Sequence, residues 1–144
     1  MAELPENPSI LSHVSIGVAD YDKAVAFYDA VLGAMGIRKV MDFESAVAYG
    51  REYPEFWVHL PENNAPAGVG NGTHFAFGAR SKDEVQAFWD AALANGAKPD
   101  GDPGPRPHYG EPYYGCFVRD LDGHKIEATF WDVELMQKLA EKAE

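Results

Sequence analysis

Three histidines and one glutamate, each on a different predicted β-strand, carry the side chains best suited to metal chemistry: His13, His59, His74 and Glu127. Successive side chains of a strand point to opposite faces, and apolar neighbours flank each of the four. We therefore expect all four on the sheet face turned away from the helices. Imidazoles and a carboxylate on rigid strands suit a divalent metal ion and leave coordination positions for substrate or water.

An internal repeat relates two of these residues. A shift of 61 residues places His13 on His74 and Phe27-Tyr28-Asp29 on Phe88-Trp89-Asp90. A strand, a helix N-cap and a helix recur in one register, which indicates a duplication. A pseudo-twofold axis between the halves could bring the two histidines together.

Each half is predicted to fold as β-α-β-β-β. Period-two alternation opens each half, and apolar residues at helical spacing follow, as in the stripe of Ala24, Phe27 and Val31. Further strands are expected at about 38–43, 46–50 and 55–60 in the first half and at 97–100, 114–119 and 124–130 in the second, with loops at 61–72 and 100–112.

The elements predict an α+β fold of two tandem βαβββ modules within a single domain, residues 1–144. Module one covers about residues 10–62, and module two covers about residues 73–131. Residues 132–144 form a C-terminal tail or an amphipathic helix.

The segment Pro103–Pro112 and its surroundings are a candidate substrate-binding region. Arginine can bind an anion in bidentate fashion, and aromatic side chains offer flat surfaces, one of which is Trp57 on the proposed metal face. The alternative is a connection fixed by prolines, whose aromatic residues pack on the sheet. The candidate substrate-binding residues are Arg106, His108, Tyr109, Tyr114 and Trp57.

Composition excludes several functions. Lys and Arg number 12 and Asp and Glu 23, and the net charge of −11 repels nucleic acids and anionic membranes. Cys116 is the only cysteine, so an internal disulfide or a CxxC motif is excluded. The N-terminus lacks the pattern of a signal peptide, and no apolar run approaches the ~18 residues of a membrane span. We expect a soluble, cytoplasmic protein.

Four segments together resemble the vicinal oxygen chelate superfamily, which comprises glyoxalases, bleomycin-resistance proteins and extradiol dioxygenases. They are His13–Val18, Ala26-Phe27-Tyr28, Thr73–Phe77 and Asp120–Glu127. The last of these, of the form D-x-D-G-x-x-I-E, is the most specific. The resemblance implies two βαβββ modules whose sheets pair into a cup, within one chain or between two.

The resemblance also implies a ligand set for a divalent ion such as Zn, Ni, Fe, Mn or Co. The superfamily's positions fall on His13, His74 and Glu127, with Glu127 also catalytic. The fourth position falls on His59, where glyoxalase I enzymes have Glu or Gln. Those enzymes place a basic residue where this chain has Ala30, which argues against glutathione as substrate. Two histidines and one glutamate alone would satisfy a dioxygenase.

We therefore expect a metal-dependent, glyoxalase-like enzyme that acts on a small molecule with vicinal oxygens, by lyase, isomerase or dioxygenase chemistry. A homodimer is expected. The alternative is a metal-free protein that binds a small molecule and resembles bleomycin-resistance proteins.

Overall fold

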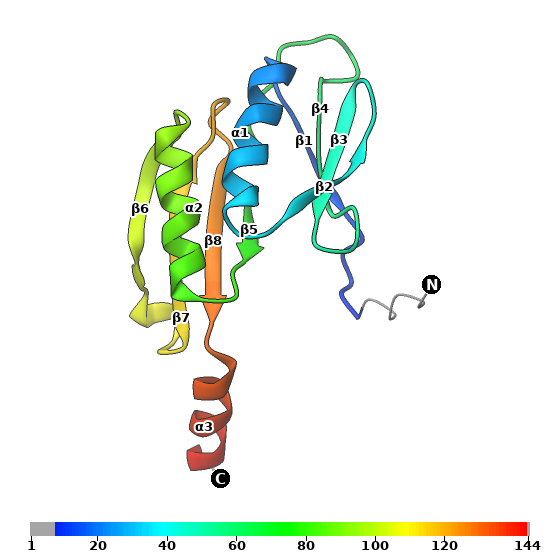
Figure 1. Cartoon of the computed structure of the whole chain (residues 1–144). Coiled ribbons are helices and arrows are strands. Elements are labelled where there is room, and N and C mark those ends of the chain that lie inside the picture. Colours follow the sequence, from blue (N-terminus) through cyan, green and yellow to red (C-terminus); the bar gives the residue numbers. More distant parts are fainter. Residues whose placement is uncertain (1–7, 144) are drawn as a thin grey trace.

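The computed structural model describes residues 8–143, which form two four-stranded mixed sheets and three α-helices (Figure 1). This α+β architecture of two modules confirms the predicted fold class. Sheet one has the strand order β1-β4-β3-β2, and sheet two has the order β5-β8-β7-β6. The bounds are β1 Val14–Gly17, β2 Arg38–Asp42, β3 Ala46–Gly50, β4 Phe56–His59, β5 His74–Gly78, β6 Lys98–Pro105, β7 Tyr113–Arg119 and β8 Lys125–Trp131.

The two long helices of the modules begin at the capping residues that the sequence indicates. In α1 (Tyr21–Gly33), the Asp20 side chain accepts a hydrogen bond from the backbone N–H of Lys23 at 3.1 Å. In α2 (Lys82–Ala94), the Ser81 hydroxyl accepts one from the backbone N–H of Glu84, also at 3.1 Å. Each bond satisfies an N–H group at the start of the helix, which has no partner within the helix.

The hydrophobic core runs through both modules. Helices α1 and α2 lie next to each other and cover the same side of the two sheets (Figure 1). Between the sheets, the ring of Phe56 in β4 packs against Phe75 and Phe77 in β5, with centroid distances of 6.0 and 4.9 Å. The modules are therefore held together by buried apolar area.

A turn of module two binds the start of module one. In this β7–β8 turn (Asp120–His124), Asp122 accepts a hydrogen bond from the backbone N–H of Ala19 at 2.9 Å, just before α1. His124 is buried and its Nε2 donates to the carbonyl of Gly17 at 2.8 Å. Asp120, also buried, accepts from the Tyr28 hydroxyl at 2.5 Å. The D-x-D-G motif thus joins the two modules.

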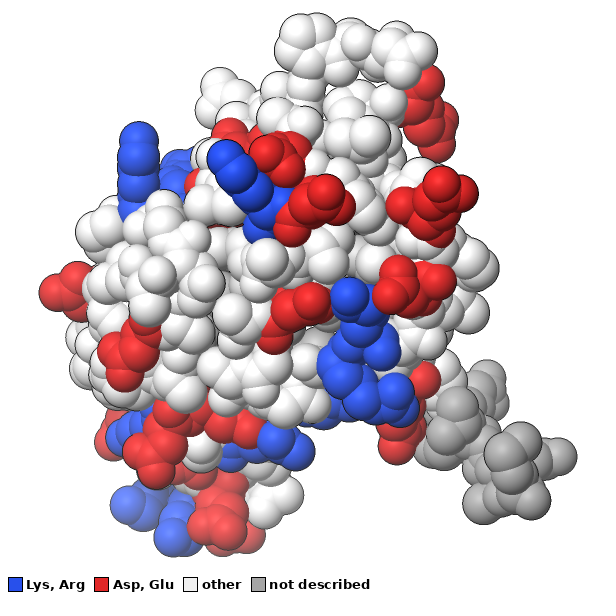
Figure 2. Space-filling view, turned by 45° about the horizontal axis from the view of Figure 1, so that its top comes forward, with Lys and Arg blue, Asp and Glu red and all other residues white. Residues whose placement is uncertain are grey.

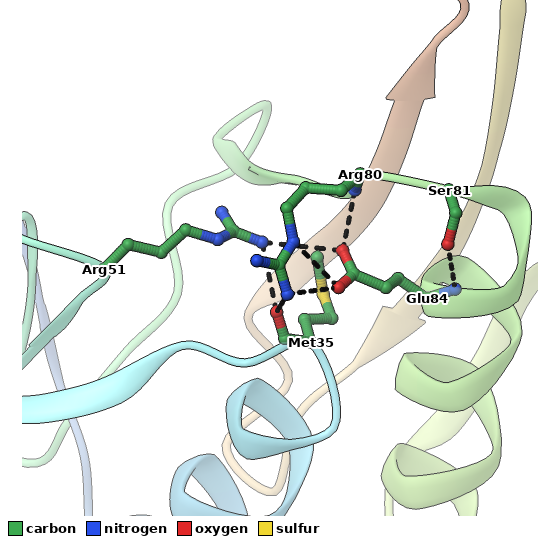
Figure 3. A network of polar contacts seen from close by, with 5 residues as sticks. All are labelled: Met35, Arg51, Arg80, Ser81 and Glu84. Atoms are coloured by element: carbon green, nitrogen blue, oxygen red, sulfur yellow. Dashed lines mark hydrogen bonds and ion pairs between the residues drawn. The ribbon is translucent and has the colours of Figure 1, made fainter.

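The corresponding turn of module one reaches the start of α2 (Figure 3). The Arg51 guanidinium, which follows β3, lies 3.6 Å from the Glu84 carboxylate and donates to the carbonyl of Met35 at 3.1 Å. Arg80 donates to the same carbonyl at 3.3 Å and to Glu84 at 2.6 Å. The two turns are therefore reciprocal, since each contacts the entry to the other module's helix.

One predicted boundary was wrong. The first part of the loop expected over 100–112 is strand, because β6 continues to Pro105, and a single 3-10 turn, Pro107–Tyr109, follows before β7. The prolines are tolerated because β6 is the edge strand of sheet two and its register shifts at two points.

The predicted C-terminal helix is present as α3 (Val133–Ala143), which extends from the end of β8 away from the rest of the chain (Figure 1). None of its residues is buried. Across residues 8–143, no helix combines the length and apolar character that a membrane span requires. Figure 2 shows acidic side chains spread over the face in view, with the basic ones gathered in a few groups.

Candidate functional site

The four predicted ligands lie on the sheet faces that the helices leave uncovered, here called the open faces. Strand β1 is an edge of sheet one and β5 is the matching edge of sheet two. His13 directly precedes β1, and His74 begins β5, so the repeat places both histidines at equivalent edges. Both line one cavity of about 380 Å3 between the modules.

His74 and Glu127 form a pair in module two. The His74 Nε2 lies 3.3 Å from Oε1 of Glu127. The Glu127 side chain is only 7% exposed, whereas that of His74 is 47% exposed. A buried carboxylate is costly unless it has partners, so the pairing explains how Glu127 can be buried in this sheet.

Tyr113 is the second partner of Glu127, because its hydroxyl donates a hydrogen bond to Oε2. Burial, and then this bond to the carboxylate, raise the pKa of the Tyr113 phenol above its ordinary value. The hydroxyl therefore keeps its proton and fixes one carboxylate oxygen, which leaves the other directed at His74. Partners of this kind orient metal ligands.

An aromatic wall continues from Tyr113 along the open face of module two. The Tyr113 ring meets Tyr109 and Trp131 edge-on, at centroid distances of 5.0 and 5.2 Å. His108 packs on Tyr109 at 4.1 Å. Together with His74 and Glu127, these tyrosines and Trp131 line a cavity of about 380 Å3.

His13 and His59 lie on the open face of module one and line a cavity of about 650 Å3 together with Trp57. The His59 Nδ1 donates to the carbonyl of Leu60 at 2.6 Å, which leaves Nε2 as the nitrogen able to bind a metal. The His13 Nδ1 is hydrogen-bonded to the Ser12 hydroxyl at 3.0 Å.

The backbone register shows which residue of module one corresponds to Glu127. The N–H of Val18 bonds to the carbonyl of His59 at 3.0 Å, and the N–H of Ala79, the repeat partner of Val18, bonds to the carbonyl of Thr129 at 2.8 Å. His59 is thus equivalent to Thr129. The equivalent of Glu127 lies two residues earlier and is Trp57.

Two of the predicted substrate-binding residues, Arg106 and Tyr114, do not line the cavity of the His74 and Glu127 pair. The Arg106 guanidinium donates to the carbonyls of Asp102, Gly104 and Pro105 in β6. Tyr114 pairs across the sheet with Phe130 and packs against the core on the helix side, whereas Tyr113 shares the face of Glu127.

The structure therefore forms two pairs of predicted ligands rather than one set of four. Within residues 8–143, no three His, Cys, Asp or Glu side chains are close enough to hold a metal ion together. The pairs are His13 with His59, which share a cavity on the open face of module one, and His74 with Glu127, which are in contact. Among the described residues, His13 and His74 line the cavity between the modules, but no hydrogen bond joins them.

The sequence profile of the glyoxalase/bleomycin resistance protein/dioxygenase superfamily matches residues 10–128. The chain belongs to this superfamily. It is 30% identical over 120 residues to a probable lactoylglutathione lyase from Vibrio cholerae, covering 80% of this chain and 86% of that one.

Solved structures of the superfamily agree. A glyoxalase/bleomycin resistance protein from Albidiferax ferrireducens has a TM-score of 0.77 and 36% identity, with 85% of this chain and 98% of that one covered. Lactoylglutathione lyase from Agrobacterium tumefaciens shares the fold, with a TM-score of 0.61 and 23% identity over 86% and 95% of the two chains. Superfamily members typically use a divalent metal.

Tyr113 is the site residue that the sequence prediction omitted. It stands next to Tyr114, and only the boundary and register of β7 decide which of the two faces Glu127. The close approach of His74 to Glu127 also depends on strand register, here that of the parallel strands β5 and β8.

Proposed function

We propose that this protein is a metal-dependent member of the glyoxalase superfamily that acts on a small molecule with vicinal oxygens. The observation that carries the proposal is the pairing of His74 with a buried Glu127, whose second oxygen is fixed by Tyr113. A neutral imidazole and a carboxylate in contact are suitable donors for a divalent ion such as Zn, Ni, Fe, Mn or Co.

We assign three protein ligands, His13, His74 and Glu127. The register supports this set because Trp57, which cannot bind a metal, stands at the position equivalent to Glu127. His59 lies two residues after Trp57 on the same face of β4, where it could contact a substrate. Two histidines and one carboxylate are the set of non-haem Fe(II) oxygenases, and this observation favours dioxygenase chemistry as a second candidate beside the lyase reaction named for the relatives.

The complete site forms between two chains in this proposal. Each chain offers one ligand pair on each open face. The open face of module one carries exposed apolar side chains, among them Leu11 and Met41, 62% and 42% exposed, and Phe43, which stacks on Trp57. A homodimer in which module one of each chain covers module two of its partner would bury these side chains and unite His13 with His74 and Glu127.

The residues of the chain have separate roles. Glu127 would accept a proton removed from the substrate on Oε1, the carboxylate oxygen that Tyr113 does not bind. Tyr113 orients that carboxylate through its hydrogen bond, and the aromatic wall excludes water. A divalent ion, when bound, would supply Lewis acidity toward the vicinal oxygens of the substrate.

Metal titration tests this proposal. The purified chain is titrated with Zn²⁺, Ni²⁺, Fe²⁺, Mn²⁺ and Co²⁺. We expect about one ion per chain, bound by His13, His74 and Glu127. His74→Ala and His13→Ala should abolish binding, whereas His59→Ala should retain it. Assays for lactoylglutathione formation and for oxygen uptake with catechol then separate the lyase from the dioxygenase. Binding that survives both ligand variants contradicts the proposal.

The alternative is a metal-free binding protein. Its support is the cavity of about 650 Å3 lined by apolar and aromatic side chains, including Trp57 and Met41. Such a protein would bind a planar molecule with quenching of tryptophan fluorescence, and neither His74→Ala nor added metal would change its affinity.

A further inference from the structure

A row of basic residues crosses the open face of module two beside His74. Across the strands of sheet two, His74 lies opposite Lys125, Lys125 lies opposite Arg119, and Arg119 lies opposite Lys98. These residues come from all four strands of sheet two, and adjacent strands lie about 4.8 Å apart. Three cations of a chain with net charge −11 are thus placed in one line that ends at a proposed metal ligand.

The row borders a cavity of about 560 Å3. Its walls are His74, Arg119, Lys125 and the loop of residues 69–73, in which Gly72 has a φ of +90°. Polar surface predominates there, in contrast to the aromatic wall on the other side of His74. His74 therefore belongs both to this cavity and to the pair with Glu127.

Asp100 arranges the two central cations without neutralising both. Its Oδ2 lies 3.1 Å from the Nε of Arg119 and 3.6 Å from the Nζ of Lys125. Arg119 also donates to the carbonyl of Gly123. Its other three N–H groups have no hydrogen-bond partner among residues 8–143, so donors remain for a ligand.

Stability alone does not account for this row. Like charges directly opposite each other on neighbouring strands are destabilising. Module one has the same backbone arrangement, but Glu55 and Gly50 occupy the positions equivalent to Lys125 and Arg119. The fold therefore does not require cations here.

We propose that this cavity binds an anionic group, a carboxylate or a phosphate, through Arg119 and Lys125, and that the group belongs to the molecule held at His74 and Glu127. The second part rests on the proposed function. Arg119 supplies a planar pair of donors, and Lys125, whose ammonium also lies 4.9 Å from the Phe117 ring centroid, supplies a second charge. The substrate class is then a small acid or phosphate ester with vicinal oxygens.

The test measures binding of inorganic phosphate and of malonate to the metal-free chain by calorimetry at constant ionic strength. We expect one of the two anions to bind, and the tighter one identifies the class. Arg119→Gln and Lys125→Gln should each weaken binding about tenfold, as expected for the loss of a charge-assisted hydrogen bond. Arg119→Lys should retain part of the affinity, and Asp100→Asn should increase it.

Arg38→Gln is the matched control, because Arg38 is exposed at the module-one position equivalent to Lys98. A similar loss in this variant would show a general charge effect and overturn the proposal, as would phosphate and malonate that do not bind at all. Zn²⁺ titration separates the two proposals. A chain that binds the metal but neither anion refutes only the anion site. A chain that binds an anion but no metal refutes the proposed function and, with it, the link between the anion and the molecule held at His74 and Glu127.

Discussion

The two modules share their helix-facing sides and differ on their open faces. The buried stripe of α1 recurs in α2, with Phe27 equivalent to Phe88 and Val31 to Ala92. On the open face, module two has Glu127 beside the large Phe117, whereas module one has the large Trp57 beside the small Ala48. The two modules thus share an apolar packing face and differ on the open face, which supports the site proposed there.

The largest effect is expected at Glu127, which differs in chemistry from Trp57, its equivalent in module one. Glu127→Gln should lower activity by about 10²–10⁴-fold, the usual contribution of a general acid or base, and should weaken metal binding. Trp57→Phe, at the equivalent position of module one, should leave metal stoichiometry unchanged. The measurements are kcat and metal content of the purified variants, and a Glu127→Gln variant that retains both would refute the assignment.

A smaller effect is expected at Tyr113, which has no tyrosine counterpart in module one. Tyr113→Phe removes the hydrogen bond to Glu127 but keeps the ring, so metal affinity or activity should fall about 10–100-fold. Tyr109→Phe is the matched control, because its ring lines the same cavity. Equal losses in the two variants would show that Tyr113 acts through packing alone.

The β7–β8 turn gives a prediction about stability. Tyr28→Phe leaves the buried Asp120 without its hydroxyl partner and should lower the free energy of unfolding by about 1–3 kcal/mol. In the reciprocal turn, Arg51→Gln removes a partly exposed ion pair with Glu84, which Arg80 still binds, and a hydrogen bond to the Met35 carbonyl, and it should cost less, about 1 kcal/mol. Urea denaturation of both variants measures the difference, and an equal cost would contradict the role given to burial.

Alkaline pH should destabilise the folded chain, and two buried tyrosines of module one should account for part of this effect. Burial, followed by Asp120, raises the pKa of Tyr28, and burial, followed by Asp29, raises that of Tyr49. In the unfolded chain both phenols titrate near their ordinary pKa of about 10. The folded state therefore binds more protons above pH ~10, and its free energy of unfolding should fall there by about 1.4 kcal/mol per pH unit for each tyrosine.

Module two has Trp89 and Val118 at the equivalent positions, but its Tyr113 and Cys116, whose pKa values burial also raises, add to the slope. Tyr49→Phe should remove one tyrosine's share of the slope when stability is measured between pH ~10 and ~12. A slope that is unchanged in Tyr49→Phe would show that another group is responsible.

The fold was predictable from the sequence because periodicity and caps act locally. The alternation around His13 and His74 and the stripes of the two helices gave the elements and the duplication. The extent of β6 was not predictable, since its prolines are typical of a loop and are allowed only by the strand's place at a sheet edge.

The sequence predicted which sheet face carries the candidate site, but not which residues of neighbouring strands lie opposite each other. Trp57 and His59 lie on the same face two residues apart, and period-two alternation cannot distinguish them. Only the hydrogen bonds of Val18 and Ala79 show that Trp57 matches Glu127. Tyr113 and Tyr114 lie on opposite faces, and the extent and register of β7 decide which of them faces Glu127. The basic row that ends at His74 could not be recognised either, because it depends on the register of all four strands.

The reciprocal turns have a consequence for the covalent connection between the modules. Each sheet is complete within its own stretch of sequence, 14–59 or 74–131, and residues 60–73 contribute no strand to either sheet. The core contact of Phe56 with Phe77 and the polar contacts of the two turns cross the boundary without using those residues. Fragments produced by cleavage after Asn64 should therefore associate and refold as a noncovalent pair, which makes the chain a candidate for fragment complementation.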